Sequence, residues 1–495
     1  MSLHGGWRNA AAALGLGLGF GLPVASVNAA SWSWLKDPFK IEHKTSPAPE
    51  TRWEPAGPLP EVKVPPTAAP LPSAQALTLP ELTEYALRNN PRTRQAWYAA
   101  RAAASSLGVV LGDDLPLITG SYNVVRVHPV SGTTGLISPW INRWGGQISF
   151  NYVLYDFGAG DDKVEAAEYR LLAANLAQNR VLQEVVFQVE QAYYQLIGIE
   201  ALGRVNEQSV KNTETVLDAV RRRRESGLAT VADVYRSETQ VAQAQLILAR
   251  SRGELEKARG QLATVVGLPL NSSIRVQTLS APPQTTQAVA AITDYLERVK
   301  SSRPDLVAAE AQARAARATA NAASKAGLPS IEINGVFQSS QWARHGIFTT
   351  DTARPPTLAS NLALNVRIPI FSGFKDTYTV RQSEMQAQQA EAVRDSLFRQ
   401  TQLEVWQSYY DLQTVRGSIN STELLVRSAE QTAEATIARY RGGFGTILDL
   451  ITAQQDETNA RTQRIQSYLD WYTVLARLHF FVGASDLITT KTEKK

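Results

Sequence analysis

The chain contains no cysteine, and only 5 of its 495 residues are histidine. The lack of cysteine excludes disulfide bonds, thiolate metal ligands and a cysteine nucleophile, and it removes the acceptor for an N-terminal lipid anchor. The histidines are scattered without the spacing of metal ligands: His4, His43, His128, His345 and His479. We therefore expect no metal site, no cofactor and no enzymatic activity.

The chain also has little net charge, at +4. It has no phosphate-binding glycine loop or Gly-x-Ser-x-Gly motif beyond its first 30 residues. So small a charge gives no reason to expect a nucleic-acid partner. Asp113-Asp114 and Asp161-Asp162 are paired carboxylates, but they lie at element boundaries, where turns and caps favour aspartate. Capping is therefore favoured over catalysis for both pairs.

Long apolar runs are confined to the N-terminus. Arg8 precedes an apolar stretch, and Val27-Asn28-Ala29 fits the small-x-small cleavage pattern, so we expect residues 1–30 to be a signal peptide. No later stretch approaches the ~20 apolar residues of a spanning helix, so a periplasmic protein, a secreted protein or a β-barrel is expected. Residues 31–76 hold ten of the 24 prolines and are expected to be an extended tether, and 486–495 a polar tail.

The two halves of the chain repeat each other. Asn90-Pro91 recurs as Arg303-Pro304, 213 residues later, and beyond a loop the offset becomes 216. Landmarks at the second offset are Tyr193-Tyr194 with Tyr409-Tyr410, Gly227 with Gly443, Asp233 with Asp449, and Val266-Gly267 with Val482-Gly483. A constant offset at separated landmarks indicates an internal duplication.

Each half predicts the same order of elements: a helix of roughly 30 residues, two strands, a very long helix, a glycine turn and a return helix. The first helices are expected at about 77–111 and 290–325, and the long helices at about 160–225 and 376–441. We therefore divide the chain into two repeats, residues 77–275 and 286–485. About 66 residues at 1.5 Å each make a rod of roughly 100 Å.

The predicted strands alternate between apolar and polar residues over about ten positions, the length of a tilted membrane strand. A half-buried strand of a soluble sheet has the same period, but no other strands are available to build a soluble core. The residues expected to face lipid are Ile148, Phe150, Tyr152, Leu154, Leu362, Leu364, Val366 and Ile368. Four strands cannot close a barrel, and open edges are not tolerated in lipid, so several chains must pool their strands.

Seven-residue spacing on the first return helix predicts a coiled-coil seam through Val234, Val241, Leu248, Leu255 and Leu262. A similar pattern on the second predicts a seam through Ile465, Tyr468, Tyr472, Leu475 and Leu478. The two copies differ, because Glu457 and Arg464 stand where Val241 and Leu248 predict apolar residues. Trp140 and Trp144 flank the first loop between strands and are candidates for anchors at the outer headgroups.

Tyr155-Asp156-Phe157-Gly158, which leads from strand into long helix, and its counterpart Phe371-Ser372-Gly373-Phe374 resemble motifs of the TolC family of outer-membrane efflux proteins. The resemblance covers about residues 77–485. It implies a mostly α fold with a membrane β-barrel: a homotrimer with a 12-strand barrel on a periplasmic α-helical barrel, in the outer membrane. It also implies a periplasmic adaptor (membrane-fusion) protein, an inner-membrane pump and outer-membrane lipid as partners.

The resemblance places adaptor contacts at the hairpin tips: Ser226, Gly227, Leu228, Gly442, Gly443 and Phe444. It places a periplasmic gate at Tyr440, Asp449 and Asp233. Departures from the family pattern are Gly445 for an arginine, Thr452 for a second aspartate and Ala232 for a threonine. Capping of the return helices by Asp233 and Asp449 is an equally good interpretation, compatible with the first. The run Arg221–Arg224 favours a solvated helix face over an adaptor or solute contact.

The leading functional hypothesis is a passive exit duct for small molecules in a tripartite efflux system. An outer-membrane component of a type I protein-secretion system would use the same architecture. An exported coiled-coil scaffold without a pore is the hypothesis from another class, and an exported enzyme has no residue constellation to support it.

Overall fold

The computed structural model describes residues 77–128, 140–270, 272, 274–276, 291–345 and 355–483, the side chains of 343–345 excepted. These residues belong to one compact unit, Thr67–Lys495. The predicted signal peptide, the predicted proline-rich segment and the polar tail lie outside the described residues.

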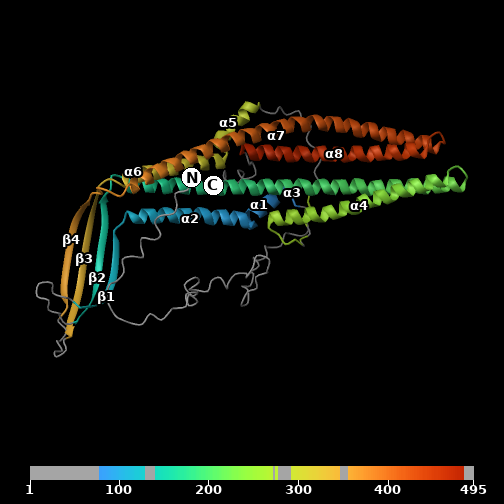
Figure 1. The fold of residues 1–495 in the computed structure, drawn as a ribbon. Coiled ribbons are helices and arrows are strands. Elements are labelled where there is room, and N and C mark those ends of the chain that lie inside the picture. The colour runs from blue at the N-terminus through green and yellow to red at the C-terminus, as the bar shows by residue number, and fades with distance from the viewer. Residues whose placement is uncertain are drawn as a thin grey trace, which may run out of the picture. The chain divides into compact units, whose positions relative to one another are not determined.

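Both halves contain the same elements in the same order. The first half is α1 (Leu79–Asn89), α2 (Pro91–Asp113), β1 (Leu117–Val127), β2 (Trp140–Tyr155), α3 (Ala159–Glu225) and α4 (Val231–Val266). The second is α5 (Ile292–Ser302), α6 (Pro304–Lys325), β3 (Ser330–His345), β4 (Thr357–Arg367), α7 (Lys375–Arg441) and α8 (Ile447–Val482). The strands lie at one end of the long helices, and the α3–α4 and α7–α8 turns at the other (Figure 1). Within the described ranges no helix is both long and apolar enough to cross a membrane.

The first helix of each half is two helices, where the sequence predicted one. The break falls at Asn90-Pro91 and at Arg303-Pro304, because a residue before proline is driven out of the helical region. Asn90 has φ −66° and ψ 128°, and Arg303 has φ −90° and ψ 112°. Each proline then starts the next helix, a position where its missing amide costs nothing.

In both halves, the residue before the proline donates a side-chain hydrogen bond to the end of the return helix. The Asn90 side-chain amide donates to the Val265 carbonyl at 2.8 Å, and the Arg303 guanidinium donates to the Phe481 carbonyl at 3.4 Å. Val265 and Phe481 are 216 residues apart, near the ends of α4 and α8. The residue before the proline therefore fixes the end of each return helix, with an amide in one copy and a buried cation in the other.

A buried ionic cluster surrounds the second junction. The Arg303 side chain is 2% exposed and pairs with Asp305 and, at 2.8 Å, with Glu404 of α7. Arg180 of α3 lies 3.8 Å from Asp305, with its guanidinium 3.9 Å from the centre of the Phe480 ring. Burial alone would raise the pKa of Asp305, but the hydrogen bond from Arg303 and the charge of Arg180 lower it. The cluster joins α3, α6, α7 and the end of α8.

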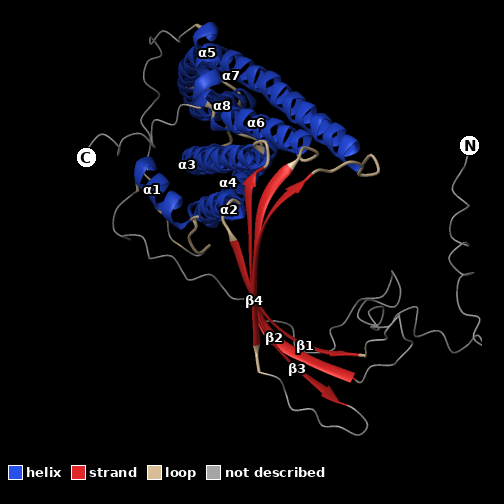
Figure 2. Cartoon of the chain, turned by 90° about the vertical axis from the view of Figure 1, so that its left-hand side faces the viewer, coloured by secondary structure: helices blue, strands red, loops and turns tan. Residues whose placement is uncertain are grey.

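The four strands form one antiparallel sheet in the order β1-β2-β3-β4 (Figure 1), which Figure 2 shows in red, extending away from the helices. The central pair, β2 and β3, comes from different halves of the chain and is 16 residues long in each strand. The outer strands β1 and β4 are 11 residues long, and each has one edge without a partner in the sheet. The sheet is therefore open at both sides.

The predicted seam of α4 is confirmed. Val234, Val241 and Leu262 are buried, and Leu248 and Leu255 are half-buried. Of the seam predicted for α8, Leu478 is buried and the other four positions are half-buried, as Leu248 and Leu255 are in α4. The buried row lies instead on small residues at seven-residue spacing, which an apolar count overlooks: Ala453, Ala460, Ser467 and Val474. On α7 the buried row is Val405, Leu412, Ile419, Val426, Ala433 and Tyr440.

Two glycines with nearly the same φ angle can be used to test how tightly the chain is packed near the Arg303-Pro304 break. Gly483 has φ +85° and Gly443 has φ +82°. A methyl group on Gly483 would collide with the Ser302 carbonyl, whereas one on Gly443 would meet nothing within 4 Å. Gly443→Ala should cost only the backbone strain, about 1 kcal/mol, and Gly483→Ala clearly more. Thermal loss of helical circular dichroism measures both, and equal shifts in the two variants would contradict the packing described.

Candidate functional site at the hairpin tips

The two hairpin turns are built alike. Gly227 has φ +73°, and the Leu228 amide donates to the Arg223 carbonyl at 2.7 Å. Gly443 has φ +82°, and the Phe444 amide donates at 2.9 Å to the carbonyl five residues earlier. This hydrogen-bond pattern ends a helix on a left-handed glycine. The glycine turns are therefore at the predicted positions.

The residues predicted to contact an adaptor are exposed at these turns: Ser226, Gly227, Leu228, Gly442, Gly443 and Phe444. Leu228 and Phe444 are the large apolar side chains among them, 68% and 83% exposed. Their role in binding an adaptor stays a prediction.

Asp233 and Asp449 each complete a capping box at the start of a return helix. The Asp233 carboxylate accepts from the Thr230 amide at 2.9 Å, and that of Asp449 from the Thr446 amide at 3.2 Å. In return each threonine hydroxyl accepts from the aspartate amide, at 3.2 and 3.1 Å. One of the two expected roles, capping, is therefore present.

These hydrogen bonds lower the pKa of both carboxyl groups. The backbone amide of Thr230 is the main cause for Asp233, and the side chain of Thr446 is the main cause for Asp449. A carboxyl group whose pKa is lower in the folded state than in the unfolded state stabilises the fold when it is ionised. This contribution to stability is fully present above the ordinary carboxyl pKa of about 4. It is lost as pH falls through the lowered value, so both tips carry a carboxylate at neutral pH. The pore-lining role of these groups stays a prediction.

Tyr440, the predicted gating tyrosine, is 7% exposed and lies between the two hairpins. Its ring packs in a cluster with Leu217 and Val220 of α3 and Leu450 of α8. An Arg223 side-chain N–H donates to the Tyr440 carbonyl at 2.6 Å, and the Arg223 guanidinium lies 4.7 Å from the ring centre. Burial raises the pKa of Tyr440. Tyr440 and Arg223 together tie the second hairpin to the first.

The sequence predicted that the run Arg221–Arg224 forms a solvated helix face, and this prediction holds for only part of the run. Arg221 pairs with Glu238 of α4 at 2.8 Å, and Arg223 holds Tyr440. Arg222 and Arg224 are exposed. The sequence contains Arg223 but no sign of its partner, which lies 217 residues further on.

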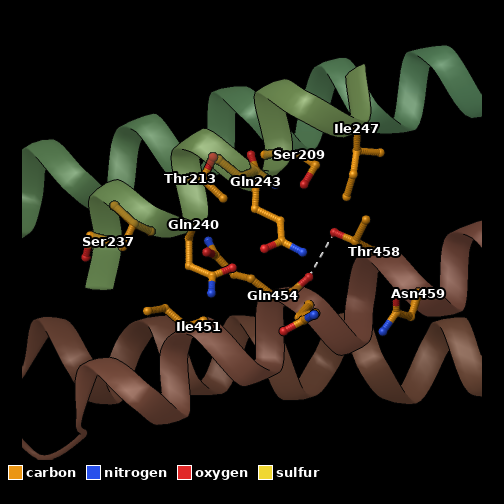
Figure 3. Close-up of a pocket in the computed structure, with 14 residues that line it drawn as sticks. Ser209, Thr213, Ser237, Gln240, Gln243, Ile247, Ile451, Gln454, Thr458 and Asn459 are labelled. Atoms are coloured by element: carbon orange, nitrogen blue, oxygen red, sulfur yellow. Dashed lines mark hydrogen bonds between the residues drawn. The ribbon is translucent and has the colours of Figure 1, made fainter. Parts of the chain in front are cut away.

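A groove is bounded by α3 and α4 on one side and by α8 on the other (Figure 3). It holds about 100 Å³, and Gln240 and Gln243 of α4 reach towards Gln454 of α8. Most of its lining is polar and uncharged: Ser209, Asn212, Thr213, Ser237, Gln240, Gln243, Gln454, Gln455, Thr458 and Asn459. A wider groove of about 1640 Å³ lies between α3 and α7 and is lined by charged residues that include Asp218, Arg222, Glu430, Glu434, Glu457 and Arg461. The paired hairpins thus have a groove on each side, and the two grooves differ widely in volume.

At the other end of the long helices, the sheet has one apolar face. Ile148 pairs with Phe337, Phe150 with Ile118, and Tyr152 with Ile333. Other apolar residues in this register are Tyr122, Val124, Trp140, Trp144, Tyr155, Ile331, Leu358, Leu362, Leu364 and Val366. Six of the eight predicted lipid-facing residues therefore share this face.

Leu154 and Ile368 depart from the expected alternation. Val153 pairs with Glu332 and Tyr155 pairs with Ile331, so Leu154 is the extra residue of a bulge. Ile368 lies just beyond β4, because Pro369 lacks the amide that would continue the ladder. Both side chains are exposed.

The carboxylate pairs have structural roles. Asp113 ends α2 and Asp114 follows it as the capping residue, while Asp162 pairs with Lys325 at 2.7 Å. His128 stacks on Trp140, and the His345 side chain lies outside the described residues. In the described ranges, no three His, Cys, Asp or Glu side chains are arranged to hold a metal ion.

The chain is similar to known proteins over most of its length. The sequence model of the outer membrane efflux protein family matches residues 82–268 and 295–484. Protein CyaE of Bordetella pertussis is 25% identical over 79% of this chain and 80% of its own. The proteases secretion protein PrtF of Dickeya chrysanthemi is 22% identical over 83% and 89%. The outer membrane protein VceC of Vibrio cholerae has the same fold, with a TM-score of 0.71 and 19% identity over 82% of this chain and 96% of that one.

The contact between Arg223 and Tyr440 can be tested by hydrogen exchange on the full protein in detergent. Arg223→Ala should speed exchange in the last two turns of α7 about tenfold, since a hydrogen bond from a charged donor contributes roughly 1.5 kcal/mol. Arg222→Ala removes the same charge one residue earlier and should leave exchange there unchanged. Identical exchange in the two variants would mean that Arg223 does not hold the second hairpin.

Proposed function

Because the chain belongs to the outer membrane efflux protein family, we propose that it is one subunit of a trimeric exit duct through which a tripartite export system passes small molecules. The protein is located in the outer membrane. The observation that carries the proposal is an open sheet with one apolar face at the end of two very long helical hairpins. Transport through such a duct is passive, since the duct itself has no energy source.

The open edges support assembly. β1 and β4 each present unpaired backbone groups, which lipid does not tolerate, and pairing β1 of one chain with β4 of the next would satisfy both. The family resemblance sets the number of chains at three, so three sheets of four strands give a 12-strand barrel. Its outer, lipid-facing surface is the apolar face that carries Ile148, Phe150, Tyr152, Leu362, Leu364 and Val366.

Exposed apolar side chains on the helices support the same assembly. α7 carries Leu403, Trp406 and Leu424, which are 55%, 47% and 62% exposed, and α2 carries Trp97 and Tyr98, which are 40% and 59% exposed. Apolar surface of this kind is normally covered by a partner. Three copies side by side would cover it and enclose a periplasmic tunnel walled by helices.

The gate of the duct is proposed at the hairpin tips. Tyr440 lies between the two hairpins and is held by Arg223, while the half-buried Asp233 and the exposed Asp449 place carboxylates at the start of each return helix. A threefold ring of Asp449 would concentrate negative potential at a narrow opening and favour cations. The departures at Gly445, Thr452 and Ala232 leave this gate with fewer ionic contacts than the family pattern has.

The tips are also the proposed docking surface for a periplasmic adaptor protein, which in turn contacts an inner-membrane pump. Leu228 and Phe444 offer exposed apolar contacts, and the groove of about 1640 Å³ beside α8 offers room for part of a helix. This groove is lined by charges of both signs, so a helix with a complementary charged face would fit it.

A second candidate function is the outer-membrane step of type I protein secretion. The similarity to PrtF, a protein named for protease secretion, favours it. The same duct serves both functions, and the pump selects the cargo. Membership in a channel family argues against the poreless scaffold and the exported enzyme.

Planar-bilayer conductance of the purified trimer tests the duct and its gate together. Asp449→Asn should lower the preference for cations over anions by roughly threefold or more at low ionic strength, because it removes the ring of charge. Thr446→Ala breaks the same capping box but keeps the carboxylate, so it should leave the preference unchanged.

Each outcome separates the claims. No channel from the wild-type protein would contradict the duct. A channel whose ion preference is the same in the wild type and in Asp449→Asn would contradict the gate assignment alone. A loss of preference in both variants would mean that the cap, and not the charge, is responsible.

A further inference from the structure

We propose that Arg126, Trp140 and His128 form a binding site for the phosphate group of an outer-membrane lipid. The site lies at the end of the apolar sheet face that is farthest from the helices. The inference rests on the proposed function, because it requires this face to contact lipid.

Arg126 continues the apolar face of β1. Tyr122 and Val124 precede Arg126 on the same face of β1. The partner of Arg126 on β2 is Asn142, which lies between Trp140 and Trp144 on that face. Along the strands the face therefore changes from aliphatic and aromatic side chains to Trp144, then to Arg126, and then to Trp140. Tryptophan marks the boundary between hydrocarbon and headgroups, so a cation between two tryptophans lies at the edge of the phosphate layer.

The length of the strand places the Arg126 side chain at that layer. From Ile118, the first apolar residue of this phase, to Arg126 is eight residues, or about 27 Å along an antiparallel strand. At a tilt of about 40° this is roughly 21 Å of depth, against an apolar band about 25 Å tall. The long stem of arginine carries the guanidinium several ångströms further, past the edge of the hydrocarbon.

Among the described residues, those around Arg126 leave its donors free. The guanidinium carbon lies 4.9 Å from the centre of the Trp140 ring, and the His128 ring stacks on Trp140 with centres 4.4 Å apart. No carboxylate in the part of the chain that the structure describes pairs with Arg126. A guanidinium lying over a ring keeps its N–H edges open, and these edges match two phosphate oxygens.

The apolar side of the sheet selects a lipid as the source of that phosphate. Only lipid would cover this face in the assembled barrel, whereas solutes in transit would meet the opposite face. Arg143 of β2 lies at the same level, opposite Val125, on that other face. The two arginines thus differ in face but not in residue type or in position along the strands.

Native mass spectrometry of the trimer in detergent can measure the affinity for phosphatidylglycerol, with inorganic phosphate as a competitor. Arg126→Gln should bind the lipid about tenfold more weakly, the effect of losing a charge-assisted contact. Arg143→Gln should bind like the wild type. Arg126→Lys keeps the charge but loses the planar donors, so it should bind about threefold more weakly, and it serves if the glutamine variant does not assemble.

An unchanged affinity in Arg126→Lys and Arg126→Gln, or an equal loss in Arg143→Gln, would overturn the site. So would displacement of the lipid by inorganic phosphate, because the site would then bind a soluble anion. Conductance is measured on the same preparations. A conducting trimer with no such lipid site would contradict this inference and leave the duct intact, whereas the absence of a channel would contradict the duct.

Discussion

The outer edges of β1 and β4 carry backbone amide and carbonyl groups that the described sheet does not pair. In hydrocarbon each such group costs several kcal/mol, and only a closed sheet removes the cost. In the proposed duct the apolar face meets lipid, and other copies of the chain pair with the open edges. These copies would also cover the exposed apolar residues along α2 and α7. The proposal therefore makes assembly a condition of membrane insertion.

More interactions hold the helices together near the two proline breaks than at the hairpin tips. Near the break before each proline, Asn90 or Arg303 fixes the end of a return helix, and in the second half a buried ionic cluster adds Arg180 and Glu404. Removing one member of such a cluster costs about 3–5 kcal/mol. At the tips, a small apolar cluster and the contact of Arg223 with Tyr440 join the hairpins. A duct that opens at the tips while its barrel stays closed would need this distribution of stability.

Strong periodic signals allowed much of the fold to be predicted. The duplication, the long helices, the glycine turns and the apolar sheet face follow from residue spacing. The fully buried row of α8 was not predicted, because residues such as Ala453 and Ser467 are small and do not stand out among large apolar side chains. The break at Arg303-Pro304 was also missed, although proline signals it. Arg223 could not be identified as the partner of Tyr440, because no local pattern links residues 217 positions apart. The capping boxes of Asp233 and Asp449 could be identified, since Thr-x-x-Asp is a local motif.

The central claim is that β1 of one chain pairs with β4 of another. The chain has no cysteine, so each introduced pair can be tested by itself. Three double variants each carry a cysteine at Thr119 in β1 and a second one in β4, at Ala359, Asn361 or Ala363. Oxidation of outer membranes that contain each double variant, followed by denaturing electrophoresis, measures the pairing. The account predicts covalent dimers and trimers from the β4 position that lies opposite Thr119 in the neighbouring chain, and little from the other two. A chain that stays monomeric with all three positions, in membranes where the protein is folded, would contradict it.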